Sequence, residues 1–435
     1  MTQYRPVNAM ARKGRSPLLV TREALAPDAR SYRWPMLFGV WLVYFCFGLM
    51  TASLAPLVGP IRAELGLSHA AMGGVLGAWP LVYIASAAPC GMVLDRIGLR
   101  WSLFAATLLI AVSGFLRALA HDRLGLYLAV AIFGVGGPLV SAGAPKLIGL
   151  WFSDEERGLA MGIYVTGPAL GNVTALSLTN SVLMPLLDGR WRAVLTAWAL
   201  VVLAAGAVWL MVSAHPASRS LERGARAAPR ESSLAVFGEL LRARSTRIVL
   251  LMSAGIFFFN HSLNNWLPEI LRAGGMDARA AGFWSAVPSV IGIGAALVVP
   301  RLAAPGRRGL VLALLFAGAG AATLLVRTSV GPLLVSALVL QGVARGSMSA
   351  VAMLVLMGQR GDARHLGAAG GLFFSAAEIG GVLGPVSVGV LHDWSGGFDA
   401  ALNLLTAVCA ALLGLLAALP RATRSHSHHH PPPLR

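Results

Sequence analysis

Charged side chains are scarce in this sequence of 435 residues, and their scarcity excludes an ordinary soluble domain. Asp, Glu, Lys and Arg together make up 12% of the residues, about half of the roughly 25% found in an average soluble protein. Hydrophobic residues make up 56%, and the mean hydropathy is +0.71. A chain with so much apolar surface is expected to have a lipid bilayer as its solvent.

Cysteine is also rare, and the sequence motifs of common enzymes are missing. The three cysteines, Cys46, Cys90 and Cys409, lie in apolar stretches, so we expect buried thiols and no disulfide. The chain has no Gly-rich loop followed by Lys and Ser/Thr, no spaced Cys/His metal site and no nucleophile elbow. The sequence therefore predicts neither an enzyme nor ATP coupling within this chain, and it implies no metal or cofactor.

What the sequence does contain is a series of apolar stretches long enough to cross a membrane. Twelve are predicted, at 36–58, 70–94, 101–120, 125–151, 158–184, 193–214, 247–271, 280–300, 309–327, 331–358, 367–391 and 400–419. Each is about 20 residues or longer, which as a helix spans about 30 Å of hydrocarbon. Short alternating strands, the signature of a membrane barrel, are not found. We therefore predict an all-α polytopic membrane protein.

The net charge of +17 follows the predicted topology and need not mean a nucleic-acid partner. If both termini are cytoplasmic, 25 basic residues lie in inside segments and eight in outside loops. This asymmetry is the positive-inside rule. The first 33 residues are polar and Arg-rich and do not resemble a signal peptide. We expect a multi-pass protein of the inner (cytoplasmic) membrane with both termini inside.

The twelve spans divide into two groups of six. A polar linker at 215–246 separates a first half at 36–214 from a second half at 247–420, with cytoplasmic tails at 1–35 and 421–435. Span five carries Gly167-Pro168 and span eleven, its counterpart, carries Gly384-Pro385. Small residues let helices approach closely and proline bends them, so the same helix kink is predicted in both halves. The matching Gly-Pro steps favour a duplicated six-helix unit, as in transporters built from repeats.

The segment between spans two and three reads Gly91-Met-Val-Leu-Asp95-Arg96-Ile-Gly98-Leu-Arg100. Both its residues and its position resemble the loop signature of the major facilitator superfamily, and the resemblance covers about 36–420. It implies two six-helix bundles that alternate between inward-open and outward-open states. It also implies a conformational latch at this loop, with Gly91 for close helix packing, Asp95 at a helix end and Gly98 for the turn. An ordinary polar turn is the alternative.

A finer resemblance points to the cyanate and nitroimidazole permease branch. It rests on Phe115-Leu-Arg117, Ala144-Pro145-Lys146 and Asn264-Asn265-Trp266. The chain lacks an arginine in span one, so the anion site of that branch cannot be carried over whole. It also lacks the arginine in the middle of span four that is typical of proton-coupled drug exporters, which weakens an efflux interpretation. Arg117, near the end of span three, is expected at the membrane interface.

Two opposite charges lie deep in the second half, where an unpaired charge is costly. Arg345 in span ten lies roughly 20 Å from the cytoplasmic end and Glu378 in span eleven roughly 16 Å, by the helical rise per residue. Consecutive helices are usually neighbours, so the two groups are expected within reach of each other. One interpretation is a structural ion pair. The other is that Arg345 binds an anionic substrate, with Glu378 as its resting partner or as a proton site.

Span seven carries a polar cluster near mid-membrane that predicts a water-lined cavity. His261 is the only histidine within a predicted span, and Asn260, Asn264 and Asn265 surround it. Three amides and an imidazole within six residues exceed what helix packing requires. The resemblance implies that spans one, four, seven and ten line the central cavity. We expect Asn260, His261 and Asn264 to bind substrate, and His261 is also a candidate proton relay.

Two further candidates lie in the first half. Lys146 is one of two lysines, against 33 arginines, and its compact ammonium either binds substrate or extends to the interface from the shallow end of span four. In span one, Tyr44 is a polar side chain that substrate can reach.

These features together predict a secondary active transporter that moves a small organic or inorganic anion by alternating access, with proton coupling. An exporter of amphipathic drugs or metabolites is the first alternative. A transport-inactive membrane sensor or scaffold is the second. The expected partners are a small-molecule substrate, H⁺ as coupling ion and the bilayer, and a monomer is expected to suffice.

Overall fold

A computed structural model describes residues 31–216, 218, 241–304, 306–328, 331–358 and 366–427. Within these ranges the chain forms helices and no strands, and twelve helical segments are long and apolar enough to cross a membrane. The predicted all-α fold of two six-helix bundles is therefore confirmed. The expected N-terminal tail up to residue 30, most of the linker and residues 428–435 lie outside the described residues.

The helices of the first half begin at residue 33 and end at residue 212. They are α3 (Arg33–Ala52), η3 (Ala55–Leu57) and α4 (Val58–Leu65) in the first span; α5 (His69–Leu76) and α6 (Ala78–Ile97) in the second; α7 (Leu99–Leu119); α8 (Arg123–Trp151); α9 (Asp154–Leu178), η4 (Thr179–Leu183) and α10 (Met184–Leu186) in the fifth; and α11 (Trp191–Val212).

The second half repeats the pattern of six spans with fewer breaks. It consists of α14 (Arg244–Ala273), α15 (Ala278–Leu302), α16 (Arg308–Leu325) with η5 (Val326–Thr328), α17 (Gly331–Gly358), α18 (Leu366–Ser395) and α19 (Asp399–Ser427). The predicted boundaries agree within a few residues, with two exceptions. The first span, expected to end at residue 58, continues through α4 to Leu65, and α19 continues into the segment expected to be a tail. Hydrophobicity marks where a span crosses lipid, but the helix backbone continues beyond that point.

Matching helix pairs form the centre of each half. In the first half α3 packs along α9, and in the second α14 packs along α18. A methyl group at Gly171 of α9 would overlap the carbonyl oxygen of Phe45, and a methyl at Gly380 of α18 would overlap that of Ala254. Both pairs therefore depend on glycine for close approach, as expected if one six-helix unit was duplicated.

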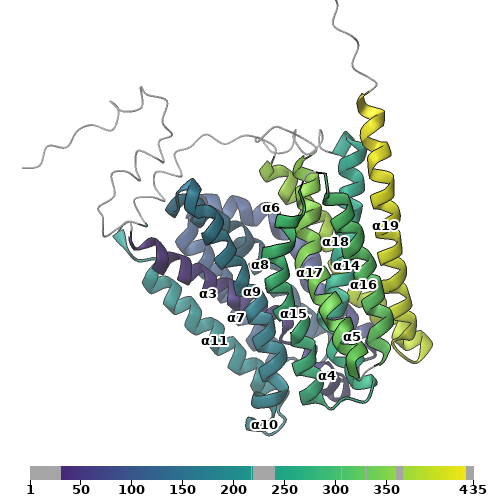
Figure 1. Cartoon of the computed structure of the whole chain (residues 1–435). Helices are drawn as coiled ribbons and strands as arrows, with labels where there is room; N and C mark the ends of the chain where they lie inside the picture. The colour runs from purple at the N-terminus through teal and green to yellow at the C-terminus, as the bar shows by residue number, and fades with distance from the viewer. Residues whose placement is uncertain are drawn as a thin grey trace, which may run out of the picture.

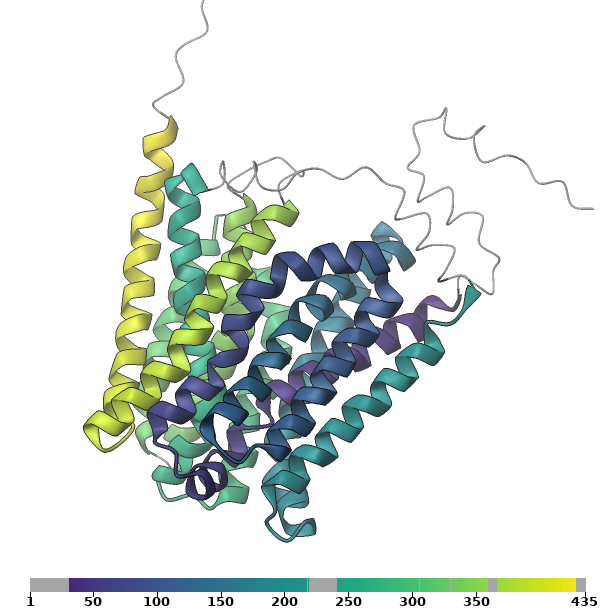
Figure 2. The same cartoon turned by 180° about the vertical axis from the view of Figure 1, so that it is seen from behind.

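The two halves are in contact at one end and diverge at the other. The helix ends that flank the linker and both described chain ends lie at the same end, called here the termini side, where the halves separate (Figures 1 and 2). Towards the opposite side, α5 packs against α18 and α9 packs against α15. Hydrogen bonds join the halves here between His69 and Ala70 and Asp393, between Asn172 and Ser289, and between Asn180 and Ala278. The structure is therefore closed on the opposite side.

Candidate functional site

Arg345 lies at mid-length on α17, and its partner is a neutral amide. Its Nη2 atom donates a hydrogen bond of 2.8 Å to Oδ1 of Asn264 on α14. Within the described part of the chain, no carboxylate forms an ion pair with Arg345. Its positive charge is therefore held in place by α14 and is not neutralised by an acidic side chain.

Glu378 on α18 is nearly enclosed, with a side chain only 7% exposed. Its nearest basic group is His261, whose Nε2 atom lies 3.8 Å from Oε2 of Glu378. That oxygen is buried and has no hydrogen-bond partner among the described residues. An acid with an unsatisfied oxygen beside an imidazole is well placed to take up or release a proton.

The ion pair expected between Arg345 and Glu378 is not formed. The expectation assumed that consecutive helices are direct neighbours, but α18 packs mainly on α14, whereas α17 and α18 touch only lightly. Because α14 contacts both helices, it supplies a separate partner for each charge. Asn264 binds Arg345, and His261 lies beside Glu378.

His261 is held between aromatic rings from both halves of the protein. Its ring stacks on Trp79 of α6, with centroids 5.3 Å apart, and on Phe257 of its own helix at 5.5 Å. A Cβ atom at Gly381 would lie 2.6 Å from Oε2 of Glu378 and 3.1 Å from the imidazole. Glycine at this position therefore leaves the room in which the acid and the imidazole meet.

The asparagines of α14 divide into different roles. Asn265 is buried and donates to the carbonyl oxygen of His261 at 2.8 Å, which is a bond within the helix. Asn264 holds Arg345, whereas Oδ1 of Asn260 is buried without a partner among the described residues. Of these three asparagines, Asn260 and Asn264 therefore remain candidates for substrate binding.

A group of tyrosines from the first half faces the charges of the second. Tyr44 of α3 stacks on Tyr164 of α9, with centroids 5.0 Å apart, and its hydroxyl lies near those of Tyr164 and Ser141. Glu378 is close enough to interact electrostatically with Tyr44 and Tyr83. Tyr83, Tyr164, Ser141 and Trp79 were not predicted from the sequence. The available signal was that four of the chain's six tyrosines lie inside apolar spans.

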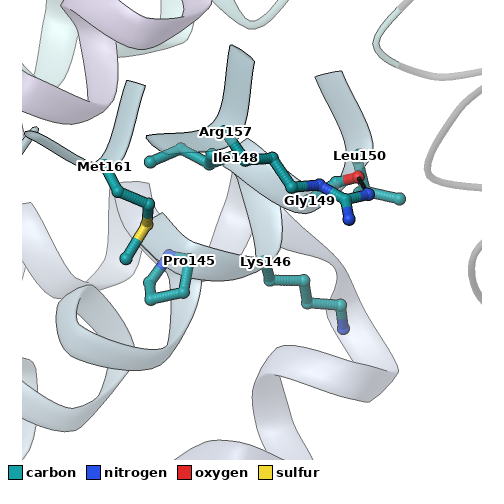
Figure 3. A pocket seen from close by; sticks show the side chains of 7 residues that line it. All are labelled: Pro145, Lys146, Ile148, Gly149, Leu150, Arg157 and Met161. Atoms are coloured by element: carbon teal, nitrogen blue, oxygen red, sulfur yellow. Dashed lines mark hydrogen bonds between the residues drawn. The ribbon is translucent and has the colours of Figure 1, made fainter. Parts of the chain in front are cut away.

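Lys146 lies outside this central cluster. Its Nζ atom forms an ion pair of 2.7 Å with Oδ1 of Asp95, on the termini side of the first half. A hollow of about 460 Å³ beside it is lined by Pro145, Lys146, Ile148, Gly149, Leu150, Arg157 and Met161. Figure 3 shows the Lys146 side chain extending away from Pro145 and Met161. The structure therefore gives Lys146 an acidic partner that neither interpretation of this residue included.

The predicted latch segment comprises the end of α6, the single residue Gly98 between the helices, and the start of α7. Gly98 has a φ of +86°, a conformation that favours glycine, and its N–H bonds to Leu94. Arg100 donates to the carbonyl oxygen of Leu210 at 3.4 Å. Gly91 does not have the close-packing role expected of it, because a Cβ atom there would meet nothing within 4 Å.

Arg117 is buried inside the first half and does not lie at the membrane interface. Its side chain is held by the carbonyl oxygen of Met50 and the hydroxyls of Ser53 and Ser113, at 3.0–3.1 Å. Its guanidinium also lies 5.2 Å from the ring centre of Phe133. Arg117 therefore donates a hydrogen bond to a backbone carbonyl oxygen near the break between α3 and η3, where helical hydrogen bonds are interrupted.

Comparisons with known proteins agree with this architecture. A family model described as Major Facilitator Superfamily matches residues 40–326. The uncharacterized transporter YycB of Bacillus subtilis is 26% identical over 84% of this chain and 89% of its own length. The D-galactonate transporter of Escherichia coli is 25% identical over 90% of this chain and 96% of its own.

Another relative is named for a drug, and solved structures share the fold. The quinolone resistance transporter of Acinetobacter baumannii is 25% identical over 81% of this chain and 85% of its own. A bacterial homolog of the human lysosomal transporter Spinster is 18% identical, with a TM-score of 0.64 over 92% of this chain and 96% of that one.

Proposed function

The chain belongs to the major facilitator superfamily of membrane transporters, and from that membership we propose that it moves a small organic anion as a secondary active transporter. The observation that carries this proposal is Arg345. It is a guanidinium at mid-length of its span whose hydrogen-bond partner is the neutral side chain of Asn264. A guanidinium binds a carboxylate through two parallel hydrogen bonds, which makes carboxylates its preferred ligands.

The tyrosines favour a carboxylate that also carries hydroxyl groups. Tyr44 and Tyr164 present hydroxyls from the first half, and the charges lie in the second, so one ligand between the halves would contact both kinds of group. The relative named as a D-galactonate transporter carries a substrate of this kind. Sugar acids are therefore the first substrates to examine.

Proton coupling is assigned to Glu378 with His261. The unsatisfied Glu378 oxygen lies 3.8 Å from the imidazole and close to the proposed anion site. Entry of an anion beside this carboxyl group brings two negative charges together, which favours uptake of a proton by one of them. Anion and proton would then be carried in the same step.

Alternating access is the proposed mechanism of movement. The contacts of α5 with α18 and of α9 with α15 close the opposite side, while the halves diverge on the termini side. With the termini in the cytoplasm, as the basic residues favour, this arrangement corresponds to an inward-open state of an inner-membrane protein. The whole site comes from one chain, so we propose that a monomer suffices.

Export of an amphipathic drug is the second candidate. The rings of Trp79 and Phe257 around His261, and the relative named for quinolone resistance, favour it. Such a substrate depends on aromatic contact and would tolerate the loss of Arg345.

A binding screen separates these candidates. Purified protein is heated with D-galactonate, tartrate, glucuronate, inorganic anions or a fluoroquinolone, because a ligand at 100 times its Kd stabilises the native state by about 2.7 kcal/mol. We expect a higher Tm with one or more hydroxycarboxylates. A higher Tm with the fluoroquinolone alone would favour the exporter. Flux of any ligand in proteoliposomes would exclude an inactive sensor or scaffold.

A further inference from the structure

Asp393, near the end of α18 in the second half, forms hydrogen bonds with the first half on the side opposite the termini. Its Oδ1 atom accepts hydrogen bonds from the backbone N–H of His69 at 3.1 Å and from the His69 ring at 3.0 Å. Its Oδ2 atom accepts from the N–H of Ala70 at 2.7 Å. One carboxylate thus binds the start of a helix that belongs to the other bundle.

These bonds complete the N-terminal cap of α5. The first N–H groups of a helix have no partner within the helix and must be satisfied by a cap or by water. Ser68, the residue before α5, accepts only from Ala71, the third of these groups, at 3.0 Å. The first two, on His69 and Ala70, are satisfied by Asp393. The first half therefore depends on the second for this cap.

The arrangement around His69 is complete without a metal ion. His69, His392 and Asp393 have side chains of the types that bind metals. However, Nη1 of Arg62 lies 2.6 Å from Nε2 of His69, and Nδ1 of His69 lies beside Asp393. A neutral His69 with its proton on Nδ1 satisfies both neighbours, whereas a cation would lie against the guanidinium.

The second half offers an internal comparison. Its second span, α15, also begins on the opposite side, but its cap is Asp277 of the same half, which accepts from Ala280 at 2.9 Å. A helix start in this position can therefore be capped locally. In α5 the equivalent local cap is Ser68, and the bonds from Asp393 to His69 and Ala70 are made in addition, from across the interface.

We propose that Asp393 is a latch that holds the two halves together on the side opposite the termini and so stabilises the conformation seen here. When the halves separate on that side, Asp393 must release the two backbone N–H groups and His69 together. The latch rests on the alternating access proposed above, and it adds the residue that keeps this side closed.

The test measures distances between spin labels in purified protein without substrate. One label pair, Leu186→Cys with Asp399→Cys, reports the opposite side, and a second, Leu159→Cys with Leu302→Cys, reports the termini side. All four side chains are exposed, and Cys46, Cys90 and Cys409 are replaced in the background. Asp393→Ala is compared with Asp277→Ala, which removes a helix cap from a residue of the same half. Asp393→Asn serves as a milder variant should Asp393→Ala lower the Tm strongly.

We expect Asp393→Ala to raise the ratio of opposite-side-open to opposite-side-closed molecules at least tenfold. Distances would lengthen on the opposite side and shorten on the termini side, whereas Asp277→Ala would retain the parent distances. Unchanged distances in both Asp393 variants would overturn the proposed role of Asp393. The distances are measured without substrate, so they test the latch independently of the flux measurement. Anion flux together with unchanged distances would reject the latch and support the proposed transport. Shifted distances in a protein that shows no anion flux would support the latch and reject the proposed transport.

Discussion

Arg345 is the side chain on which the proposed substrate class depends. Replacing it by glutamine removes charged hydrogen bonds to the anion, each of which contributes about 1.5–3 kcal/mol. We expect Arg345→Gln to bind the best hydroxycarboxylate about 10- to 150-fold more weakly, measured by titration calorimetry. Arg327→Gln, which removes a cation beside Asn403 and Asp399 far from the cluster, is the control. Equal affinity in Arg345→Gln and the parent would end the anion-site assignment.

Glu378 is the side chain proposed to carry the proton. Glu378→Gln keeps the size of the side chain but cannot take up or release a proton. We expect the variant to lose accumulation driven by a pH gradient, acidic outside, while it still exchanges labelled for unlabelled anion at equal pH. Both activities are measured in proteoliposomes. Accumulation that still follows the pH gradient would assign coupling to another group, with His261 next to be tested.

Between helices α6 and α8, the pair of Asp95 and Lys146 gives the latch segment a partner within its own half. The two side chains are 43% and 32% exposed, and so accessible an ion pair contributes about 0.2–1 kcal/mol. We therefore expect Asp95→Asn to leave the Tm and the anion affinity nearly unchanged and to alter the transport rate. Lys146→Met breaks the same pair from the other side.

The two variants give different information. Equal rate changes in both would assign the effect to the pair itself. A change in Asp95→Asn alone would mean that Asp95 acts in another conformation. If both variants transport at the same rate as the parent protein, this segment is an ordinary turn and not a conformational latch.

The contact between α5 and α18 depends on glycine as well as on Asp393. A methyl group at Gly389 would overlap the carbonyl oxygen of His69, a backbone atom that cannot rotate away. Such overpacking costs about 1–3 kcal/mol, and we expect Gly389→Ala to lower the Tm and to lengthen distances on the opposite side. A methyl group at Gly371, on the same helix, would meet nothing within 4 Å. Gly371→Ala should therefore be neutral or slightly stabilising, and the same response in both variants would contradict the steric argument.

The basic residues predict how the bundle is oriented in the membrane. We expect single cysteines at Arg230 in the linker and Ser425 near the C-terminus to react with a membrane-impermeant thiol reagent only after the cells are permeabilised. A cysteine at Leu186, exposed on the opposite side, should react in intact cells. The background again lacks the three native cysteines. Labelling of Arg230→Cys or Ser425→Cys in intact cells would overturn the proposed topology.

The twelve spans and their division into two bundles could be read from the sequence because crossing a membrane is a local property. Each segment must be apolar over about 20 residues whatever its neighbours are, and its backbone bonds are satisfied within the helix. The turn at Gly98 and the polar character of α14 around His261 were readable for the same reason. The Gly-Pro steps Gly167-Pro168 and Gly384-Pro385 likewise marked the matching helices α9 and α18.

The partners of the charges were decided only by the tertiary structure. Which side chains meet depends on which helices are adjacent and on how each helix is rotated about its axis, and neither follows from position along the chain. Glu378 therefore lies beside His261 and not Arg345, and Lys146 binds Asp95. The contact between Asp393 and α5 joins residues 324 apart, a pairing that only the packing of the two bundles produces.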